Sequence, residues 1–230
     1  MKKNIGFTLI ELAVVLLIVG LILAGILTPM ATRLEQERRS TLSAQYEDIE
    51  DALIGFAVVN GRLPCPDCTS GTPAACTNAP NSPNDGIEDT SGTGCAVGAI
   101  ATIEGNLPWV TLGVLGTDPW GSILTYHVEE AFADTVDEDT CTPATANVSF
   151  SLCSTASITI QDTGSTCGTP VSNVASNVPV VVVSQGNQLA TSCNELENTD
   201  GNNTFVEMDY NLTTATYYDD MIFWISPFLL

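Results

Sequence analysis

The hydrophobic pattern begins with one long apolar run. Residues 7–27, FTLIELAVVLLIVGLILAGIL, contain a single charge, Glu11. As an α-helix this run is about 30 Å long, which is the thickness of the hydrocarbon core of a bilayer. Lys2 and Lys3 precede it and favour a cytoplasmic N terminus. No small-residue cleavage site of the kind that ends a secretory signal follows the run. We therefore expect a retained membrane-spanning helix over residues 7–28.

Past Pro29, where we expect a kink, the pattern becomes amphipathic. One helical face, at spacings of three and four residues, carries Leu42, Tyr46, Ile49, Leu53 and Phe56. The pair Asn60-Gly61 is typical of a left-handed helix stop. We therefore expect one nearly continuous helix from Phe7 to Asn60, whose second half, residues 29–61, packs its apolar face on a globular head. The alternative, an anchor with a separate stalk, needs no such face.

The rest of the chain predicts a loop followed by a sheet. We expect a connecting loop region over residues 62–122, because residues 65–103 are rich in Pro, Gly, Ser, Thr, Asn and Cys. A type I turn is expected at Asp118-Pro-Trp-Gly121. Residues 123–230 contain strand-like runs and no further helical period, so we expect an antiparallel β-sheet head and an α+β fold. The runs are Ile123–Glu129, Val148–Leu152, Ser157–Gln161, Val178–Ser184, Thr204–Asp209 and Met221–Ser226. Of these, Val178–Ser184 is expected to be central.

The charge distribution limits the partners of the head. Six Lys and Arg oppose 27 Asp and Glu, the net charge is −21, and no Lys or Arg follows Arg62. A protein that binds a phosphate backbone uses basic residues to displace its counterions, so we expect no binding of nucleic acid. The small partners favoured by this composition are cations.

The cysteines indicate an oxidising compartment. Their even number beyond the apolar run favours up to four disulfides, and the positions are Cys65, Cys68, Cys76, Cys95, Cys141, Cys153, Cys167 and Cys193. We expect the pairs Cys141–Cys153 and Cys167–Cys193. A zinc site at Cys65-Pro-Asp-Cys68 is the weaker interpretation, because no second C-x-x-C is present and the single histidine, His127, is distant in sequence.

The N terminus strongly resembles that of type IV prepilins and type II secretion pseudopilins. The resemblance is carried by the leader Lys2-Lys-Asn-Ile-Gly6 and by Phe7-Thr-Leu-Ile-Glu-Leu12. It implies that prepilin peptidase removes residues 1–6 by cleaving after Gly6 and methylates the new amine of Phe7. It also implies a type IV pilin-like fold, with a long N-terminal helix, a variable connecting loop that is here disulfide-rich, and an antiparallel sheet. Segments of the head, among them 60–66, 107–113 and 219–226, look like minor-pilin and pseudopilin heads, although the eight cysteines and the long head depart from the major pseudopilin pattern.

Glu11 is the residue that we expect to direct assembly. A carboxylate inside a membrane helix is costly, so its presence indicates an intramembrane partner. That partner is expected to be the positively charged amine of Phe7 in a neighbouring subunit, once the leader has been removed. The alternative is a glutamate that is merely tolerated near the membrane edge.

Two acidic clusters are candidate Ca²⁺ sites, and Ca²⁺ is the cofactor that we consider. The first places Asp85, Glu88 and Asp89 around Gly86, an oxygen-rich loop with a glycine turn. The second comprises Glu195, Glu197, Asp200, Asn202, Asp219 and Asp220. Some pseudopilins bind calcium in the corresponding last loop, so the resemblance favours the second. The alternative for both is solvated charge in turns.

The expected function is structural and not enzymatic. His127 has no assignable nucleophile, and no phosphate-binding glycine loop is present. We expect a subunit of a type IV pilus or pseudopilus-like filament that polymerises through its N-terminal helix. The expected partners are copies of itself, other pilins, prepilin peptidase and the assembly platform of a pilus or secretion system.

The expected location follows from the same resemblance. Before assembly the subunit is expected in the bacterial inner membrane, and afterwards in a filament in the periplasm, at the cell surface or outside the cell. Two alternatives remain open. One is a minor pilin or pseudopilin that primes, caps or decorates a filament for adhesion or secretion. The other is a monomeric, membrane-anchored extracytoplasmic binding protein.

Overall fold

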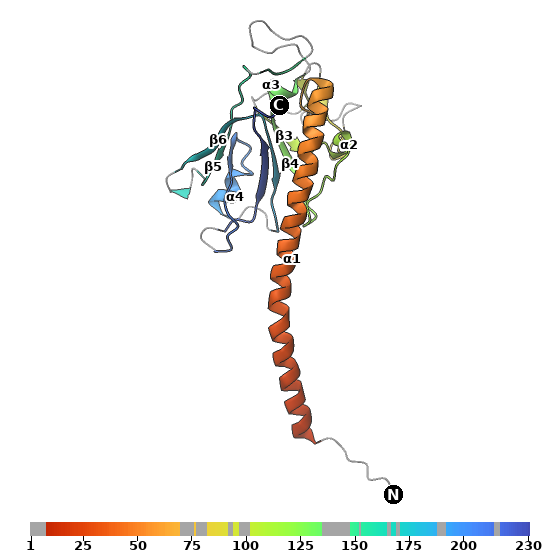
Figure 1. The fold of residues 1–230 in the computed structure, drawn as a ribbon, viewed down its shortest axis with the longest axis vertical. Coiled ribbons are helices and arrows are strands. Elements are labelled where there is room, and N and C mark those ends of the chain that lie inside the picture. Colours follow the sequence, from red (N-terminus) through yellow and green to blue (C-terminus); the bar gives the residue numbers. More distant parts are fainter. Residues whose placement is uncertain are drawn as a thin grey trace. The chain divides into compact units, whose positions relative to one another are not determined.

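A computed structural model describes most of the chain (Figure 1). The described residues are 8–69, 76, 82–91, 94–96, 102–134, 148–151, 153–164, 167–168, 171–187, 192–213 and 217–230, without the side chains of 23–31 and 102–103. Gly6, Phe7, Cys141 and the side chain of Pro29 therefore lie outside the described residues. The chain divides into two units, residues 1–43 and residues 44–230, and the second unit is called the head below.

Helix α1 (Leu9–Asn60) is continuous in its backbone. It ends where Gly61 takes a left-handed conformation, with φ of 69°, and donates its N–H to Ala57 O at 2.8 Å. This confirms the expected helix stop. In the described part of the chain, no helix combines the length and the apolar content needed to cross a bilayer. The membrane segment expected at residues 7–28 stays a prediction, because Phe7 and the side chains of 23–28 are not described.

The part of α1 that belongs to the head packs as the amphipathic pattern predicted. Tyr46, Ile49 and Leu53 of α1 are buried. The Tyr46 hydroxyl donates to Met221 O at 2.6 Å, and its ring stacks on Phe223 at a centroid distance of 5.6 Å. Both partners belong to the last strand of the chain, so this helical face is held by the C-terminal end of the head.

The main sheet has four antiparallel strands in the order β3-β4-β7-β9. The strands are β3 (Thr102–Asn106), β4 (Thr125–Glu129), β7 (Val180–Ser184) and β9 (Met221–Ile225). Every residue of β7 is buried, because both faces of the strand are covered. Val182 pairs with Phe223, on the face that meets Tyr46, whereas Val181 and Val183 pack with Phe205 in a cluster on the opposite face. The expectation of a central strand here is confirmed.

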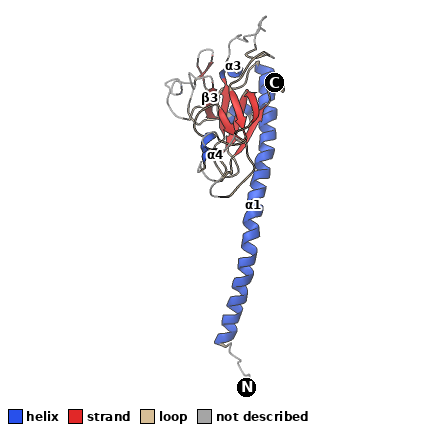
Figure 2. Cartoon of the chain, turned by 90° about the vertical axis from the view of Figure 1, so that its left-hand side faces the viewer, coloured by secondary structure: helices blue, strands red, loops and turns tan. Residues whose placement is uncertain are grey.

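A second, three-stranded sheet in the order β6-β5-β8 covers that opposite face. Its strands are β5 (Ile158–Gln161), β6 (Asn173–Val178) and β8 (Thr204–Val206), and β5 and β6 lie on the far side of the main sheet from α1 in Figure 1. The head is therefore layered as helix, sheet and sheet, and Figure 2 shows the main strands beside the helix. The short elements are β1 (Thr90–Ser91), β2 (Gly94–Cys95), α2 (Trp109–Leu112), α3 (Glu130–Ala133) and α4 (Cys193–Glu197).

The mixed α+β class with antiparallel sheets and disulfides is confirmed, and it is compatible with a pilin-like fold. Several details of the prediction were wrong. Strands β3 and β6 were missed, because their polar and small residues show little alternation of hydrophobicity. The pairing of β5 with β8 is parallel, not antiparallel. Residues 148–151 form no strand, and three helices of four or five residues are too short to show a helical period.

Disulfides fasten the segment between α1 and the sheet. Cys65 bonds to Cys95 and Cys68 bonds to Cys76, so neither cysteine of the C-x-x-C pair is available as a zinc thiolate. Cys167 bonds to Cys193, as predicted. Cys153 is also disulfide-bonded, and its predicted partner Cys141 lies outside the described residues.

Between the first two disulfides the backbone joins the main sheet. Asp67 and Asn106 exchange backbone hydrogen bonds of 3.0 and 2.8 Å. A Cβ on Gly105 would lie 2.5 Å from Asp67 O, so this close approach requires glycine.

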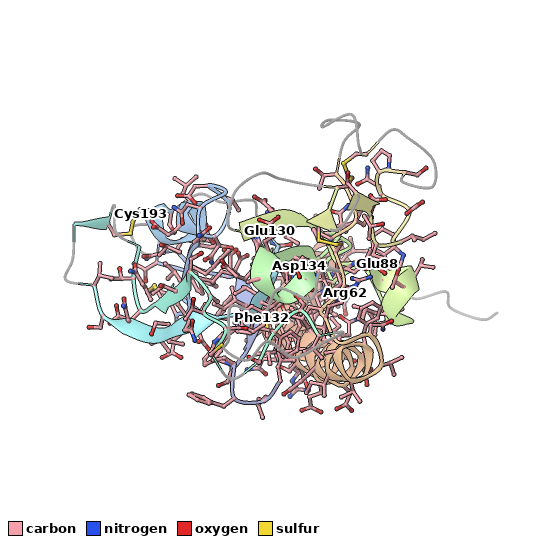
Figure 3. All side chains as sticks on the ribbon, turned by 90° about the horizontal axis from the view of Figure 1, so that it is seen from above. Arg62, Glu88, Glu130, Phe132, Asp134 and Cys193 are labelled. Atoms are coloured by element: carbon pink, nitrogen blue, oxygen red, sulfur yellow. A yellow bond between two sulfur atoms is a disulfide. The ribbon has the colours of Figure 1, made fainter. Side chains whose placement is uncertain are left out.

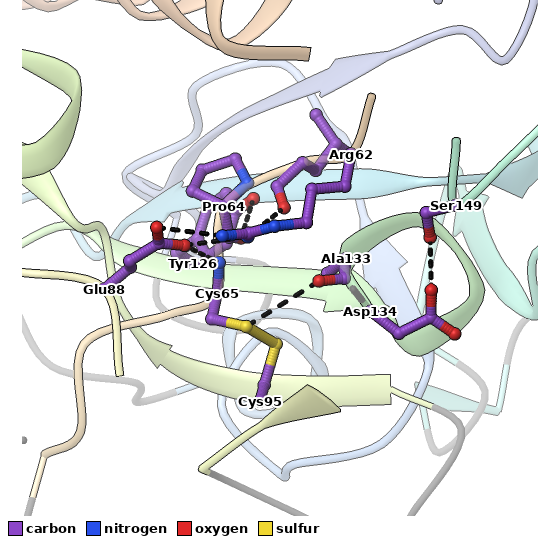
Figure 4. Close-up of a disulfide and its surroundings, with 10 residues drawn as sticks. Arg62, Pro64, Cys65, Glu88, Cys95, Tyr126, Ala133, Asp134 and Ser149 are labelled. Atoms are coloured by element: carbon purple, nitrogen blue, oxygen red, sulfur yellow. Dashed lines mark hydrogen bonds and ion pairs between the residues drawn. A yellow bond between two sulfur atoms is a disulfide. The ribbon is translucent and has the colours of Figure 1, made fainter. Parts of the chain in front are cut away.

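An ion pair fixes the end of α1 to the same segment (Figure 4). Arg62 binds both carboxylate oxygens of Glu88, at 2.8 and 3.0 Å, and Glu88 also accepts the Cys65 N–H at 3.1 Å. Both side chains are mostly buried, with exposed fractions of 13% and 18%. In the view of Figure 3 this pair and Cys193 lie on opposite sides of the head.

We predict that Glu88→Gln destabilises the head by about 2 kcal/mol, because it leaves the mostly buried Arg62 guanidinium without its counter-charge. The measurement is urea unfolding of the oxidised protein. Asp209→Asn, which removes an exposed carboxylate from the same acidic head, is the matched control and is expected to stay within about 0.5 kcal/mol of the parent. Equal effects of the two substitutions would contradict a specific role for the ion pair.

Candidate functional site

The first candidate site is the start of α1. Thr8 is followed three residues later by Glu11, which is the T-x-x-E pattern of a capping box. Glu11 Oε2 accepts the Thr8 N–H at 3.0 Å and the Thr8 hydroxyl at 2.8 Å, while the Glu11 N–H donates to Thr8 Oγ1 at 3.3 Å. The carboxylate therefore satisfies donors at the beginning of its own helix.

The Glu11 carboxylate is thus hydrogen-bonded to Thr8, which is close in sequence to the predicted cleavage point. Thr8 is the second residue after Gly6, so a carboxylate bonded to it lies close in sequence to a new Phe7 amine. Both bonds from Thr8 use Oε2, and Oε1 accepts neither of them. Sequence reasoning identified Glu11 and missed its capping role, which the Thr8-x-x-Glu11 spacing already signals.

The second candidate site is a buried cluster of three carboxylates in the head. Glu195 comes from α4, and Asp219 and Asp220 directly precede β9. One oxygen of each carboxylate lies within 4.8 Å of one oxygen of the other two. The three residues are 0%, 1% and 2% exposed. These side chains, separated by more than twenty residues in sequence, are thus brought together away from water.

Local structure fixes the first two carboxylates. Ser192 caps α4 in a reciprocal capping box with Glu195, and Glu195 Oε1 accepts the Asp219 N–H at 3.2 Å. Asp219 Oδ2 accepts the Tyr217 hydroxyl at 2.7 Å and the Asn187 N–H at 3.1 Å. Gly186 has φ of 62°, and a Cβ there would lie 2.8 Å from Asp219 Cγ. The backbone at Gly186 therefore makes the room that Asp219 occupies.

Asp220 is the least satisfied member of the cluster. Its Oδ2 accepts the Asn198 side-chain N–H at 2.9 Å, but its Oδ1 is buried and has no hydrogen-bond partner among the described residues. Burial, together with the neighbouring Glu195 and Asp219 carboxylates, raises the pKa of Asp220 to about 8. Burial also raises the pKa of Asp219.

The cluster has the composition and spacing of a divalent-cation site. Oxygens that bind one Ca²⁺ at about 2.3–2.6 Å lie at most about 5 Å apart, and the three carboxylates meet this limit. The only Lys or Arg in the sequence of the head is Arg62, which is paired with Glu88, so the head supplies no further Lys or Arg to neutralise them. Either protons or a bound cation must offset the mutual repulsion of these carboxylates.

The other predicted ligands do not join this cluster. Asp200 and Asn202 lie in an exposed turn, where Asp200 Oδ2 accepts the Asn202 side-chain N–H at 2.6 Å. Glu197 is buried, and its Oε2 would lie 3.3 Å from a Cβ on Gly164. The described residues thus bring together three of the six predicted ligands.

The first predicted acidic cluster serves as a set of hydrogen-bond acceptors. Glu88 binds Arg62, Asp85 Oδ1 accepts the Ile87 N–H at 2.9 Å, and Asp89 accepts the Cys68 N–H at 2.8 Å. Across the described residues, Glu195, Asp219 and Asp220 form the one group of three or more potential ligands with metal-binding spacing.

Comparison with known proteins concerns the N terminus. Residues 1–27 match the family model described as the prokaryotic N-terminal methylation motif. The chain carries the prepilin signature. This confirms the resemblance to type IV prepilins and pseudopilins that Gly6, Phe7 and Glu11 indicated, within the segment matched. No curated protein and no solved structure matches the chain.

Beyond the prepilin signature, several site residues were missed by sequence reasoning. Ser192-x-x-Glu195 is a recognisable capping box and would have marked the start of α4. Asn198 and Gly186 carry no such signal, because their roles depend on contacts with Asp220 and Asp219 across the fold. His127 is a buried residue of β4 that packs edge-on against Phe205, and burial lowers its pKa to about 3.

We predict that Asp220→Asn makes the head less sensitive to pH and to Ca²⁺. The pKa of about 8 in the folded head lies above the value of about 4 for an exposed Asp, so the folded state binds more protons in this window. Stability contributed by the protonated Asp220 is therefore lost as pH rises from about 4 to about 8. In a chelator, the melting temperature of the variant should fall less over this range than that of the parent.

Millimolar Ca²⁺ should reverse much of the loss in the parent by binding the ionised cluster, and it should do so far less in Asp220→Asn. Asp209→Asn serves as the control and should follow the parent in both conditions. If parent and Asp220→Asn melt in parallel across pH and Ca²⁺ concentration, the cluster does not have the properties described.

Proposed function

We propose that this protein is a structural subunit of a type IV pilus or pseudopilus-like filament. The observation that carries the proposal is the match of residues 1–27 to the N-terminal methylation motif. The motif implies processing by prepilin peptidase and entry into a filament. In this proposal the peptidase cleaves after Gly6, methylates Phe7 and releases a subunit that polymerises through α1.

The fold of the head supports a structural role of this kind. The last strand, β9, holds the Tyr46 face of α1 through a hydrogen bond and a stacked ring. A helix that is bound in this way presents its remaining surface to other molecules. Disulfides at both sides of the sheets suit a protein that works outside the cytoplasm.

Glu11 is proposed to set the register between subunits. Its Oε2 caps its own helix through Thr8, and its charge attracts the Phe7 amine of a neighbour once the leader is gone. A membrane interior strengthens this attraction because its dielectric constant is low.

The buried cluster is proposed to hold a divalent cation that stabilises the head. Support comes from the spacing of Glu195, Asp219 and Asp220 and from Asp220 Oδ1, which has no hydrogen-bond partner in the described part of the chain. Ca²⁺ is the proposed ion because all three ligands are hard oxygen donors. The bound ion would replace the missing basic side chains and would hold the segment before β9 onto α4.

The role of a minor subunit, which primes, caps or decorates a filament, is the alternative form of the same proposal. The motif at residues 1–27 is compatible with a major and with a minor subunit, so it does not distinguish between them. Abundance decides between them, because a major subunit is present along the whole filament and a capping subunit only at its tip.

We predict that the mature chain lacks residues 1–6. The intact mass of protein from sheared filaments should correspond to a chain that begins with N-methylated Phe7 and retains its disulfides. Gly6→Leu, which alters the residue before the cut, should leave a longer precursor in the membrane. A parent protein that keeps Lys2 and Lys3 as its dominant form in filaments would contradict processing at this site.

We further predict that Glu11→Gln is processed normally but joins filaments at least about tenfold less than the parent, which corresponds to 1.4 kcal/mol. Glutamine at this position keeps an oxygen for the capping box and lacks the charge. The measurement is the ratio of filament protein to membrane protein in a strain with the assembly machinery.

Two further variants separate the cap from the charge. Thr8→Val weakens the capping box and keeps Glu11, so it should assemble better than Glu11→Gln. Glu11→Asp keeps the charge on a side chain one methylene shorter and should be partly impaired. Normal filament yield from Glu11→Gln would remove charge pairing from the proposal.

A further inference from the structure

A groove of about 450 Å³ lies beside α1 on the head. Gln45, Asp48 and Ala52 of the helix form one wall, and residues 112–115, at the end of α2, form the other. The second wall is apolar apart from its backbone, and Leu115 at its edge is 64% exposed. The groove therefore combines an apolar wall, formed by residues 112–115, with a mostly polar wall formed by α1, which is called the rim below.

The rim is acidic. Asp48 lines the groove, and the exposed Glu47 and Asp51 occupy adjacent positions of the same helical surface. None of these three carboxylates takes part in an ion pair within the described residues. Three neighbouring carboxylates attract a basic side chain.

The chain carries a complementary surface in its first unit. Leu34 and Arg38 are four residues apart on α1 and so share one face of the helix. Leu34 is 51% exposed, and Arg38 forms no ion pair among the described residues. An exposed apolar side chain and a basic one, a turn apart, match the apolar groove and its acidic rim.

We propose that the groove binds the Leu34–Arg38 face of a second copy of this chain. Leu34 enters between Ala52 and Leu115, and Arg38 pairs with Asp48 and Asp51. The inference rests on the proposed function as a filament subunit and names a contact between neighbours that the N-terminal motif does not specify.

Charge complementarity selects a second copy as the occupant. The head has no basic side chain to offer, since Arg62 binds Glu88 and no Lys or Arg follows it. Lys2 and Lys3 belong to the leader, so Arg33, Arg38 and Arg39 are the basic residues that remain. Ten residues of helix rise about 15 Å, so Arg38 and Asp48 cannot pair within α1 itself.

Photo-crosslinking tests the geometry in assembled filaments. With p-benzoylphenylalanine in place of Leu34, irradiation should produce a covalent dimer of this chain, with the link mapped by mass spectrometry to residues 45–52 or 112–115. The same probe at Val58, which is 80% exposed and outside the groove, should give no link to these residues.

Charge reversal tests the ion pair. Arg38→Asp and Asp48→Arg should each lower filament yield about fivefold, because each places like charges across the contact. The double variant should return to within about twofold of the parent. Asp209→Arg, with the same change of charge elsewhere on the head, should assemble like the parent.

Three results would overturn the inference: links from Leu34 to other regions of the chain, links to a different protein, or a double variant no better than the single ones. Failure of the proposed function looks different, because the parent itself then forms no filament. Parent filaments that form normally while both single reversals are harmless would reject this contact and leave the filament proposal standing.

Discussion

The head must accommodate many carboxylates with one basic side chain, and this constraint shapes most of its polar structure. Arg62 forms an ion pair with Glu88, at the point where α1 ends and the disulfide-bonded segment begins. Elsewhere backbone N–H groups take the place of cations: Asp67 accepts from Asn84 and Gly86, and Asp89 accepts from Cys68. Where N–H donors do not suffice, as at Asp220, burial raises the pKa and favours a proton or a metal ion.

The same shortage of basic side chains underlies the proposed association of α1 with a second copy of the chain. Its acidic positions near Asp48 find no basic partner among the described residues of the head, whereas the partly exposed Arg38 lies in the first unit. In a polymer, the acidic positions of one copy can pair with Arg38 of another, since different parts of identical chains lie against each other. The buried carboxylate cluster inside the head and the acidic groove on its surface thus both follow from a composition with many carboxylates and few basic side chains.

Sequence patterns predicted the parts of this molecule that depend on local chemistry. The spacing of Tyr46, Ile49 and Leu53 predicted the buried face of α1, the valine run predicted β7, and Asp118-Pro-Trp-Gly121 predicted a turn in which Gly121 N–H donates to Asp118 O at 3.0 Å. Contacts across the fold were not predictable. Two examples are the parallel pairing of β8 with β5 and the approach of Asp219 to Gly186. They depend on how distant segments pack against each other, and such packing produces no periodic pattern in the sequence. In the sequence, Glu197 and Asp200 seemed equivalent to Glu195 as candidate metal ligands. The capping box of α4, which involves Glu195, distinguishes it from the other two.

The central claim is that this chain forms the body of a filament, and a density map of purified filaments by electron cryo-microscopy tests it most directly. The account predicts that the chain repeats along the filament, begins at Phe7, and places its amine within bonding distance of Glu11 in a neighbouring copy. A map in which the filament is built of another protein, with this chain recovered as an uncleaved membrane monomer, would contradict the account.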